Sequence, residues 1–95
     1  MKMVMVVADA AHVEAVCNDL RTLGAPGCTM LPVLEGHGRT GVHAGDRVHP
    51  GALVTLFTVA EDDLAVKLFD GLVTRRDAAG DTVTRLFVLP VERQA

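Results

Sequence analysis

Apolar and polar positions divide the first part of the chain into a strand and a helix. Lys2–Val7 is a run of β-branched residues and methionine, which is typical of a strand. From Ala10 to Leu23 apolar residues recur at helical spacing, with Asp9 placed to cap the first turn and Gly24 placed to end the last. His12 falls in that first turn, and we interpret it as a surface residue with no assigned role.

The second half of the chain repeats this order. Leu53–Val59 is a strongly apolar strand candidate, and Glu61–Asp63 then put negative charge where a helix would begin. Arg75-Arg76 put positive charge in the last turn of that helix, which matches its dipole. A turn at Asp77–Asp81 and a last strand at Thr82–Val91 complete the pattern.

Two residues disfavour the elements that contain them. Cys28–Glu35 has the composition of a strand, but Pro32 cannot donate to a ladder, so we expect this strand at a sheet edge or at a bulge. Gly71 lies inside the second helix and lowers the helix propensity by about 1 kcal/mol relative to alanine. We therefore expect a close backbone approach at Gly71.

The elements together predict one domain, residues 1–95. Their βαββαβ order predicts an α+β, ferredoxin-like fold, which is a four-stranded antiparallel sheet with two helices on one face. The first and last strands are apolar at both parities, although two helices can cover only one face. We expect a homo-oligomer that packs sheet against sheet, because that contact would also stabilise a marginal monomer.

Composition excludes two classes of partner. With three phenylalanines, no Trp or Tyr and a net charge of -3, the chain lacks the basic field and the stacking platforms that nucleic acids need. Its apolar runs fall short of the roughly 20 residues that cross a bilayer, so we expect no direct membrane insertion. The N-terminal apolar run is too short for a secretory signal, which favours a cytoplasmic location. Cys17 and Cys28 fit that location as buried free thiols, with a disulfide or a reactive site as the alternatives.

Gly36–Ala52 differs in composition from the rest of the chain. It holds no aliphatic side chain larger than valine, so it has little to bury. Most connections run to about 4–6 residues, and a loop of this length is usually functional or disordered. We therefore look for function in this segment. It contains five glycines, three histidines and two arginines, namely Gly36, Gly38, Gly41, Gly45, Gly51, His37, His43, His49, Arg39 and Arg47.

The start of this segment can hold an anion. Gly36, Gly38 and Gly41 have the spacing of a dinucleotide fingerprint, but no helix is predicted after them, which argues against a Rossmann-type site. Their backbone N–H groups could still converge on a phosphate, with Arg39 as a bidentate donor. The alternative is that these glycines only give the loop its conformational freedom.

Three histidines of the same segment are candidate metal ligands. His37, His43 and His49 are evenly spaced with Asp46 between them, and imidazole nitrogens bind divalent transition metals such as Zn, Cu or Ni. The spacing fits no known closed site, so the alternative is an unliganded, solvated loop. No catalytic constellation is visible, since Glu61–Asp63 has no histidine or nucleophile at a recognisable spacing, and we do not expect an enzyme.

Three short motifs, taken in order, resemble those of a known family. Gly27-Cys28-Thr29-Met30 is similar to a Gly-x-Thr opening of a second strand, and Gly36-His37-Gly38-Arg39 is similar to a Gly-Phe-Gly-Arg entry to a long loop. Phe87–Val91 resembles the closing strand of the same family. In their order and spacing, these motifs resemble the PII signal-transduction proteins, the nitrogen regulatory protein PII superfamily, with a shortened T-loop.

The resemblance implies a homotrimeric signalling protein rather than an enzyme. PII proteins bind adenine nucleotides in the clefts between subunits, so ATP, ADP or AMP is the expected effector. The T-loop corresponds to Gly36–Ala52 and would control an unidentified target protein, such as a transporter or an enzyme. Arg85 takes the place of the family's last phosphate-contacting lysine, although a salt bridge to Glu35 or Asp81 is the alternative. The effector-binding residues implied in this way are Gly27, Thr29, Gly36, His37, Gly38, Arg39 and Arg85.

Departures from the family pattern limit what carries over. The segment contains no Tyr, so the uridylylation that some members use cannot occur here. Thr74–Asp81 stands where the family has a phosphate-holding Thr-Gly-Lys-x-Gly-Asp-Gly-Lys run, and most of its glycines and lysines are missing. The chain also ends at Ala95, before the basic residues that contact phosphates in the family, so ATP binding need not carry over. The alternative function is metal binding or metal tolerance, similar to the trimeric CutA relatives, with His37, His43 and His49 as ligands.

Overall fold

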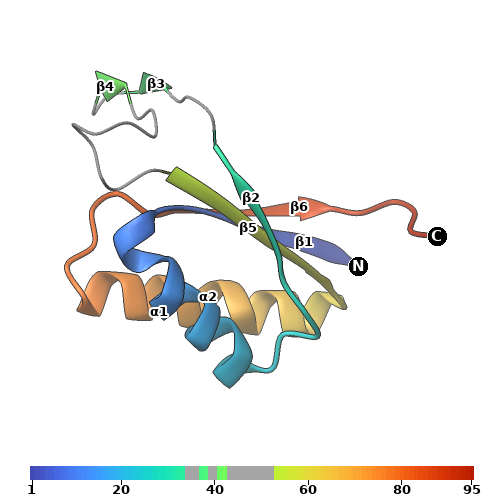
Figure 1. The fold of residues 1–95 in the computed structure, drawn as a ribbon. Coiled ribbons are helices and arrows are strands. Elements are labelled where there is room, and N and C mark those ends of the chain that lie inside the picture. The colour runs from blue at the N-terminus through green and yellow to red at the C-terminus, as the bar shows by residue number, and fades with distance from the viewer. Residues whose placement is uncertain (34–36, 39–40, 43–52) are drawn as a thin grey trace.

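The computed structural model describes residues 1–33, 37–38, 41–42 and 53–95 (Figure 1). Strands and helices follow one another in nearly the order that the sequence predicts. The elements are β1 (Lys2–Asp9), α1 (Ala10–Leu23), β2 (Thr29–Pro32), β3 (His37–Gly38), β4 (Gly41–Val42), β5 (Leu53–Ala60), α2 (Asp62–Ala78) and β6 (Arg85–Pro90).

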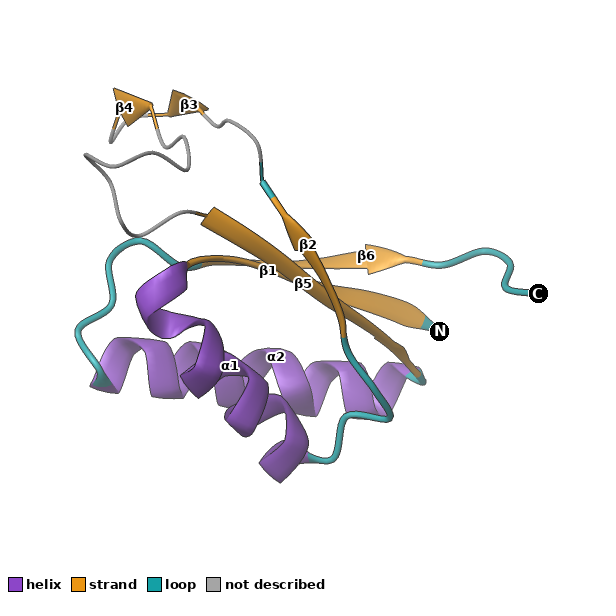
Figure 2. Cartoon of the chain, viewed as in Figure 1, coloured by secondary structure: helices purple, strands orange, loops and turns teal. Residues whose placement is uncertain are grey.

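Four of the strands form one antiparallel sheet in the order β2-β5-β1-β6. Both helices lie against the same face of this sheet, as Figure 2 shows. The arrangement confirms the α+β, ferredoxin-like βαββαβ fold. β2 is an edge strand, as expected from Pro32, and both edge strands, β2 and β6, end on a proline.

Part of the expected loop Gly36–Ala52 is paired. His37 lies opposite Val42 and Gly38 opposite Gly41, so β3 and β4 form a small antiparallel ladder where the sequence predicted only a loop. The connection between them is two residues long, which is a common length for a hairpin. The pairing escaped prediction because two-residue strands carry no alternation of apolar and polar side chains. The other residues of Gly36–Ala52 lie outside the described residues.

The two outer strands are shorter than expected. β2 begins at Thr29 rather than Cys28 and ends at Pro32, while residues 34–35 of the expected strand lie outside the described residues. β6 covers Arg85–Pro90 rather than Thr82–Val91. The late start of β6 has a local cause, because the backbone N–H groups of Val83 and Thr84 donate to a side chain instead of a neighbouring strand. Polar side chains can compete with the ladder for backbone donors in this way.

The hydrophobic core lies between the sheet and the helices. Alternate residues of β1 and β5 point into it, and they meet one face of each helix. The buried apolar side chains are Val4, Val6, Ala8, Val16, Leu20, Leu56, Ala60, Ala65, Leu68 and Leu72.

The opposite face of the sheet is apolar as well. Met5 lies opposite Phe57 on one side and Phe87 on the other, and Met3 lies in the same way between Val59 and Leu89. No helix covers this face (Figure 2). Phe87 is 47% exposed although it is one of the largest apolar side chains of the protein. The two-sided apolar pattern of the strands is therefore real, and one side of it is left open in a single copy.

Both ends of α1 have the caps that the sequence predicts. The Asp9 side chain accepts a hydrogen bond from the backbone N–H of His12 at 3.2 Å. At the other end, Gly24 has φ 96°, a left-handed conformation that favours glycine, and the N–H of Ala25 donates to the Leu20 carbonyl at 2.9 Å. The caps fix where α1 begins and ends.

α2 begins beside the start of the chain. Its first turn carries Asp62 and Asp63, as the charge pattern predicts, and the N-terminal ammonium of Met1 donates to Asp62 Oδ1 at 2.7 Å. This hydrogen bond, together with the ammonium charge, holds the pKa of Asp62 below its ordinary value. The pair stabilises the anionic form of Asp62 near the positive end of the helix dipole.

A buried carboxylate organises the turn between α2 and β6. Asp81 Oδ1 accepts from the N–H of Val83 at 2.9 Å and of Thr84 at 3.0 Å, while Oδ2 accepts from the Thr84 hydroxyl. The side chain of Asp81 is only 4% exposed. His12 Nδ1 lies 2.7 Å from Asp9 Oδ1 and 3.7 Å from Asp81 Oδ2, so the start of α1 meets this turn through His12.

His12 and Asp81 form the junction between the start of α1 and this turn, and each shifts the pKa of the other. Burial alone would raise the pKa of Asp81, but hydrogen bonds from Thr84 and Val83 and the charge of His12 outweigh it, so the pKa lies below its ordinary value. The hydrogen bond to Asp9 raises the pKa of His12, burial opposes this, and the charge of Asp81 adds to the rise. The junction therefore favours an ionised Asp81 and a protonated His12.

Gly71 lies where the two helices touch. A Cβ placed on it would come within 2.8 Å and 2.9 Å of the two methyl carbons of Leu23, which ends α1. The expected close approach is confirmed, although a side chain rather than a backbone makes it. Because the end of the Leu23 side chain can shift by rotating about its χ angles, the contact limits the size of residue 71 without forbidding a small side chain.

The contact between Gly71 and Leu23 predicts non-additive stability. Gly71→Ala alone should gain less than the helix-propensity difference of about 1 kcal/mol, because Leu23 must move. In a Leu23→Ala background the same substitution should gain the full amount. Denaturant unfolding of the four proteins at one protein concentration measures this coupling. Equal gains in both backgrounds would show that Leu23 does not restrict residue 71.

The hydrogen bonds of Asp81 predict a strong effect of its removal. Asp81→Ala should lower the free energy of unfolding by at least about 1–3 kcal/mol, because it leaves partly buried donors of Val83 and Thr84 unpaired. Asp77→Ala is the matched control, since Asp77 is exposed and its ion pair with Arg76 contributes at most about 1 kcal/mol. Similar losses in the two variants would refute the role of Asp81 in this turn.

The raised pKa of His12 predicts a pH dependence with a definite sign. The folded state binds the His12 proton more tightly than the unfolded state, so this contribution to stability is fully present below about pH 6.5. It is lost as the pH rises through the higher pKa of the folded state. Between about pH 6 and 8 the parent should therefore lose more stability than His12→Gln. Parallel pH profiles of the two thermal midpoints would contradict the coupling.

Candidate functional site

The start of β2 forms one wall of an open groove of about 300 Å³. Gly27 is exposed, and a Cβ placed on it would meet nothing within 4 Å. Thr29 lies opposite Phe57 in the sheet register, so an exposed hydroxyl side chain and a phenyl ring stand side by side. The groove is lined by Pro26, Gly27, Cys28, Thr29, Phe57, Thr58, Val59 and Gln94.

Arg85 begins β6 at the other edge of the sheet. Its Nη1 lies 3.0 Å from the carbonyl oxygen of Thr82 and 3.2 Å from that of Thr84, so the guanidinium folds back over the turn. Within the described residues, Arg85 thus contacts backbone carbonyls and does not form the expected salt bridge to Asp81. The carboxylate oxygens of Asp81 accept instead from the backbone N–H groups of Val83 and Thr84 and from the Thr84 hydroxyl. The other suggested partner, Glu35, lies outside the described residues.

Thr29 and Arg85 do not share a site within one copy. The register puts Thr29 in line with Phe57, Met5 and Phe87, and Arg85 two residues along from Phe87. Both side chains therefore belong to the face that the helices leave open. Their strands are the two edges of the sheet, three strand spacings or about 14 Å apart. They can meet only where one copy borders another.

The remaining predicted site residues fall in or beside the expected loop. The backbones of His37 and Gly38 form β3. Gly36 and Arg39 lie outside the described residues, as do the metal candidates His43 and His49. The anion contact at Gly36–Arg39 and the histidine metal site therefore stay predictions. Among residues 1–33 and 53–95, no three His, Cys, Asp or Glu side chains are arranged to hold a metal ion.

The turn after α2 offers little to a phosphate. Arg75 pairs with Asp19 across the helices at 2.9 Å, and Arg76 pairs with Asp77 at 3.0 Å. The N–H groups of Val83 and Thr84, which could otherwise converge on an anion, already donate to the carboxylate of Asp81. The Asp81 carboxylate thus occupies the backbone N–H groups that a bound anion would need. This agrees with the missing glycines and lysines of Thr74–Asp81.

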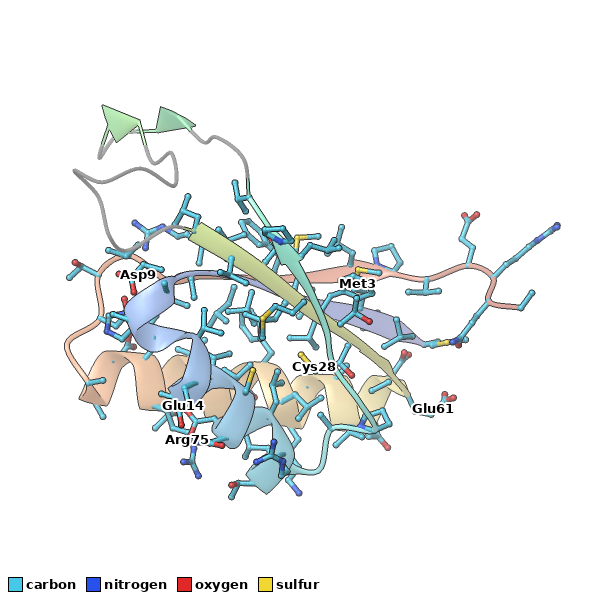
Figure 3. The ribbon with its side chains drawn as sticks, in the orientation of Figure 1. Met3, Asp9, Glu14, Cys28, Glu61 and Arg75 are labelled. Carbon is cyan, nitrogen blue, oxygen red and sulfur yellow. The ribbon has the colours of Figure 1, made fainter. Side chains whose placement is uncertain are left out.

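The two cysteines lie together rather than separately in the core. Both line a hollow of about 410 Å³ between α1 and the segment that leads into β2. Cys17 is partly buried and Cys28 is exposed, so the expectation of two buried thiols is wrong for Cys28. The reason is that Cys28 precedes an edge strand, where no neighbouring strand covers it. Figure 3 shows Cys28 at the foot of β2, toward the helices.

The sequence reasoning missed His12, which it left without a role. His12 joins the N-cap of α1 to the buried Asp81. The contact of His12 with Asp9 has a local signal in the sequence, because an aspartate N-cap followed three residues later by a polar side chain has the spacing of a reciprocal cap. The contact with Asp81 has no local signal, since it joins residues 69 positions apart.

β6 carries a second open surface. An open hollow of about 560 Å³ lies along it and reaches from the sheet to α2. Phe87, Val88 and Leu89 are each more than a third exposed. Consecutive exposed apolar residues on an edge strand are unusual for a protein that remains a monomer. The residues that line this hollow are Met5, Phe69, Leu86, Phe87, Val88 and Leu89.

Neither helix of the described chain is both long and apolar enough to pass through a membrane. No curated protein sequence matches this one.

Several solved structures share this fold. The CPII protein of Thiomonas intermedia K12, a nitrogen regulatory PII-like protein bound to ADP, AMP and bicarbonate, has a TM-score of 0.72 at 23% identity, covering 97% of this chain and 88% of CPII. A PII-like signaling protein of Thermus thermophilus has a TM-score of 0.66 at 21% identity, covering 92% of this chain and 81% of the other. At these identities the likeness concerns the fold.

The family comparison goes further, because it covers the whole sequence. The family model described as nitrogen regulatory protein P-II matches residues 1–95. Its members are signalling and regulatory proteins rather than enzymes. The order of strands and helices, the open sheet face and the position of the glycine-rich segment between β2 and β5 agree with that match. The chain therefore belongs to the nitrogen regulatory protein P-II family.

Proposed function

We propose that this protein is a homotrimeric PII-type regulator that binds an adenine nucleotide between neighbouring copies and controls a target protein through residues 36–52. The observation that carries the proposal is the position of Thr29 and Arg85. They lie on the same open face but at opposite edges of the sheet, so a site containing both needs two copies.

The open face supports association through the sheet. Met3, Met5, Phe57, Phe87 and Leu89 form a continuous apolar surface that the helices do not cover. Burying such a surface contributes about 25 cal/mol for each Å² of apolar area removed from water. Association would therefore stabilise a domain of 95 residues whose own core is small. A closed trimer brings the β2 edge of one copy beside the β6 edge of the next.

The groove at the start of β2 suits the base and sugar of a nucleotide. Phe57 and Val59 offer apolar contact, and Thr29 and Gln94 offer hydrogen-bonding groups. The three carbonyl contacts of Arg85 come from one nitrogen, and a guanidinium carries five N–H donors, so Arg85 of a neighbouring copy can also contact a phosphate. CPII bound to ADP and AMP supports an adenine nucleotide as the effector.

Phosphate recognition should be weaker than base recognition. Asp81 occupies the backbone donors of the turn after α2, and Arg75 and Arg76 are held in ion pairs within their own copy. Of the three arginines named here, Arg85 is the one that lies on the open face of the sheet. AMP and ADP are accordingly better candidates than ATP. Control of the target requires that the nucleotide bind one state of residues 36–52 better by about 1–3 kcal/mol.

Phe87→Asp tests the assembly and the site together. The parent should sediment as a trimer at micromolar concentration, and the variant should sediment as a monomer, because an unpaired carboxylate cannot be buried in the apolar contact. Titration calorimetry with AMP, ADP and ATP should then show that the variant has lost at least about tenfold in affinity. The loss follows because Arg85 and Thr29 no longer meet.

Val66→Asp is the matched control. Val66 is also a large exposed apolar residue, at 54%, but it lies on α2 and not in the sheet. This variant should keep both the trimer and the affinity of the parent. A monomeric parent would refute the assembly. A trimeric parent that gives no heat with any of the three nucleotides would refute the effector and leave the assembly standing.

A further inference from the structure

Cys17 and Cys28 lie at the boundary between α1 and the segment that leads into β2. In β2, Met30 lies opposite the buried Leu56, so Met30 and the residue two positions before it point toward the helices. That residue is Cys28. Cys17 belongs to α1 and packs against the hydrophobic core from the other side. Both side chains line the same hollow, together with Arg21 and Met30.

The surroundings of Cys28 affect its ionisation. Burial raises the pKa of Cys28, and the nearby Cys17 raises it further. The Sγ atom of Cys28 also lies 3.8 Å from the carbonyl oxygen of Thr29. A disulfide needs Cβ atoms about 3.5–4.5 Å apart, so two cysteines that line one hollow can be joined where one of their segments can shift.

The segment before Cys28 can supply that shift. Residues 25–28 belong to neither a helix nor a strand, and the backbone at Gly27 has open space around it. α1, by contrast, is fixed at its end by the left-handed Gly24 and at its start by Asp9. A bond between the two sulfur atoms would therefore move the start of β2 rather than the helix.

We propose that Cys17 and Cys28 form a reversible intramolecular disulfide, with a low-molecular-weight disulfide such as glutathione disulfide as the oxidant, and that this bond changes the groove at the start of β2. The exposed Cys28 reacts first. Its thiolate attacks one sulfur of glutathione disulfide, which gives a mixed disulfide and releases one glutathione thiolate. The Cys17 thiolate then attacks the Cys28 sulfur and releases the second.

The exchange balances without a further reactant. Two protein thiols are oxidised to one disulfide, and one glutathione disulfide is reduced to two glutathione molecules, which take up the two protons. Because the pKa of Cys28 is raised, only a small share of it is thiolate at neutral pH, so the first step should quicken about tenfold for each pH unit. Excess reduced glutathione reverses both steps.

The consequence for binding rests on the proposed function. Cys28 lines both the thiol hollow and the groove that contains Gly27 and Thr29. Drawing Cys28 toward α1 moves these two neighbours with it, so the oxidised protein should bind AMP and ADP with affinities that differ from those of the reduced protein by about fivefold or more. The nucleotide site would then respond to the thiol redox state.

Intact-mass spectrometry of the folded protein after treatment with glutathione disulfide tests the bond. The parent should lose both thiol hydrogens within one chain and regain them with dithiothreitol. Cys17→Ser should stop at the mixed disulfide on Cys28, and Cys28→Ser should react far more slowly, because Cys17 is partly buried. A parent that keeps a mixed disulfide, or that joins two chains, would overturn the proposal.

Calorimetry of the same samples tests the effect on the groove. Oxidised and reduced parent should differ in affinity for AMP and ADP, while Cys28→Ser should bind equally before and after the treatment. If the disulfide forms and the two affinities agree, the link to the groove is refuted and the bond stands. If neither form binds a nucleotide, the proposed effector fails, and the mass measurement still decides the disulfide.

Discussion

The structure depends on a mismatch between four strands and two helices. Two helices can cover one face of such a sheet, and they do so with a core built from alternate residues of β1 and β5. The other alternate residues, Met3, Met5 and Phe57 among them, are equally apolar and have no helix over them. A single copy therefore leaves one apolar face of its sheet in water. Association through the sheet would bury this face, and every later step of the functional proposal builds on it.

The same mismatch decides where a ligand site can form. In a single copy, the described residues that line the groove near Gly27 and Thr29 include no basic residue. Arg85 lies at the opposite edge of the sheet. Assembly would supply the missing charge from a neighbour. In the turn after α2, the carboxylate of Asp81 already occupies the backbone donors of Val83 and Thr84. The proposed binding would therefore depend on the subunit boundary more than on that turn.

Local patterns predicted the fold well because its main features have local causes. Asp9 and Gly24 bound α1 as expected, Pro32 lies on an edge strand, and Gly71 makes a close contact. The candidate site was harder to predict from the sequence, because its geometry joins residues that are distant along the chain. The junction of His12 with Asp81 crosses most of the sequence, and the pairing of β3 with β4 is too short to leave a pattern. The exposure of Cys28 follows from the strand order and not from its neighbours in sequence.

The prolines that end both edge strands have a consequence for how copies can join. Pro32 and Pro90 have no backbone N–H, so each outer rim of the sheet lacks a donor at its last position. An incoming strand could pair with either rim over only a short length, which hinders the endless strand-by-strand growth that leads to fibrils. If copies associate as proposed, this feature would favour a closed assembly through the apolar face over open-ended growth along the strand edges.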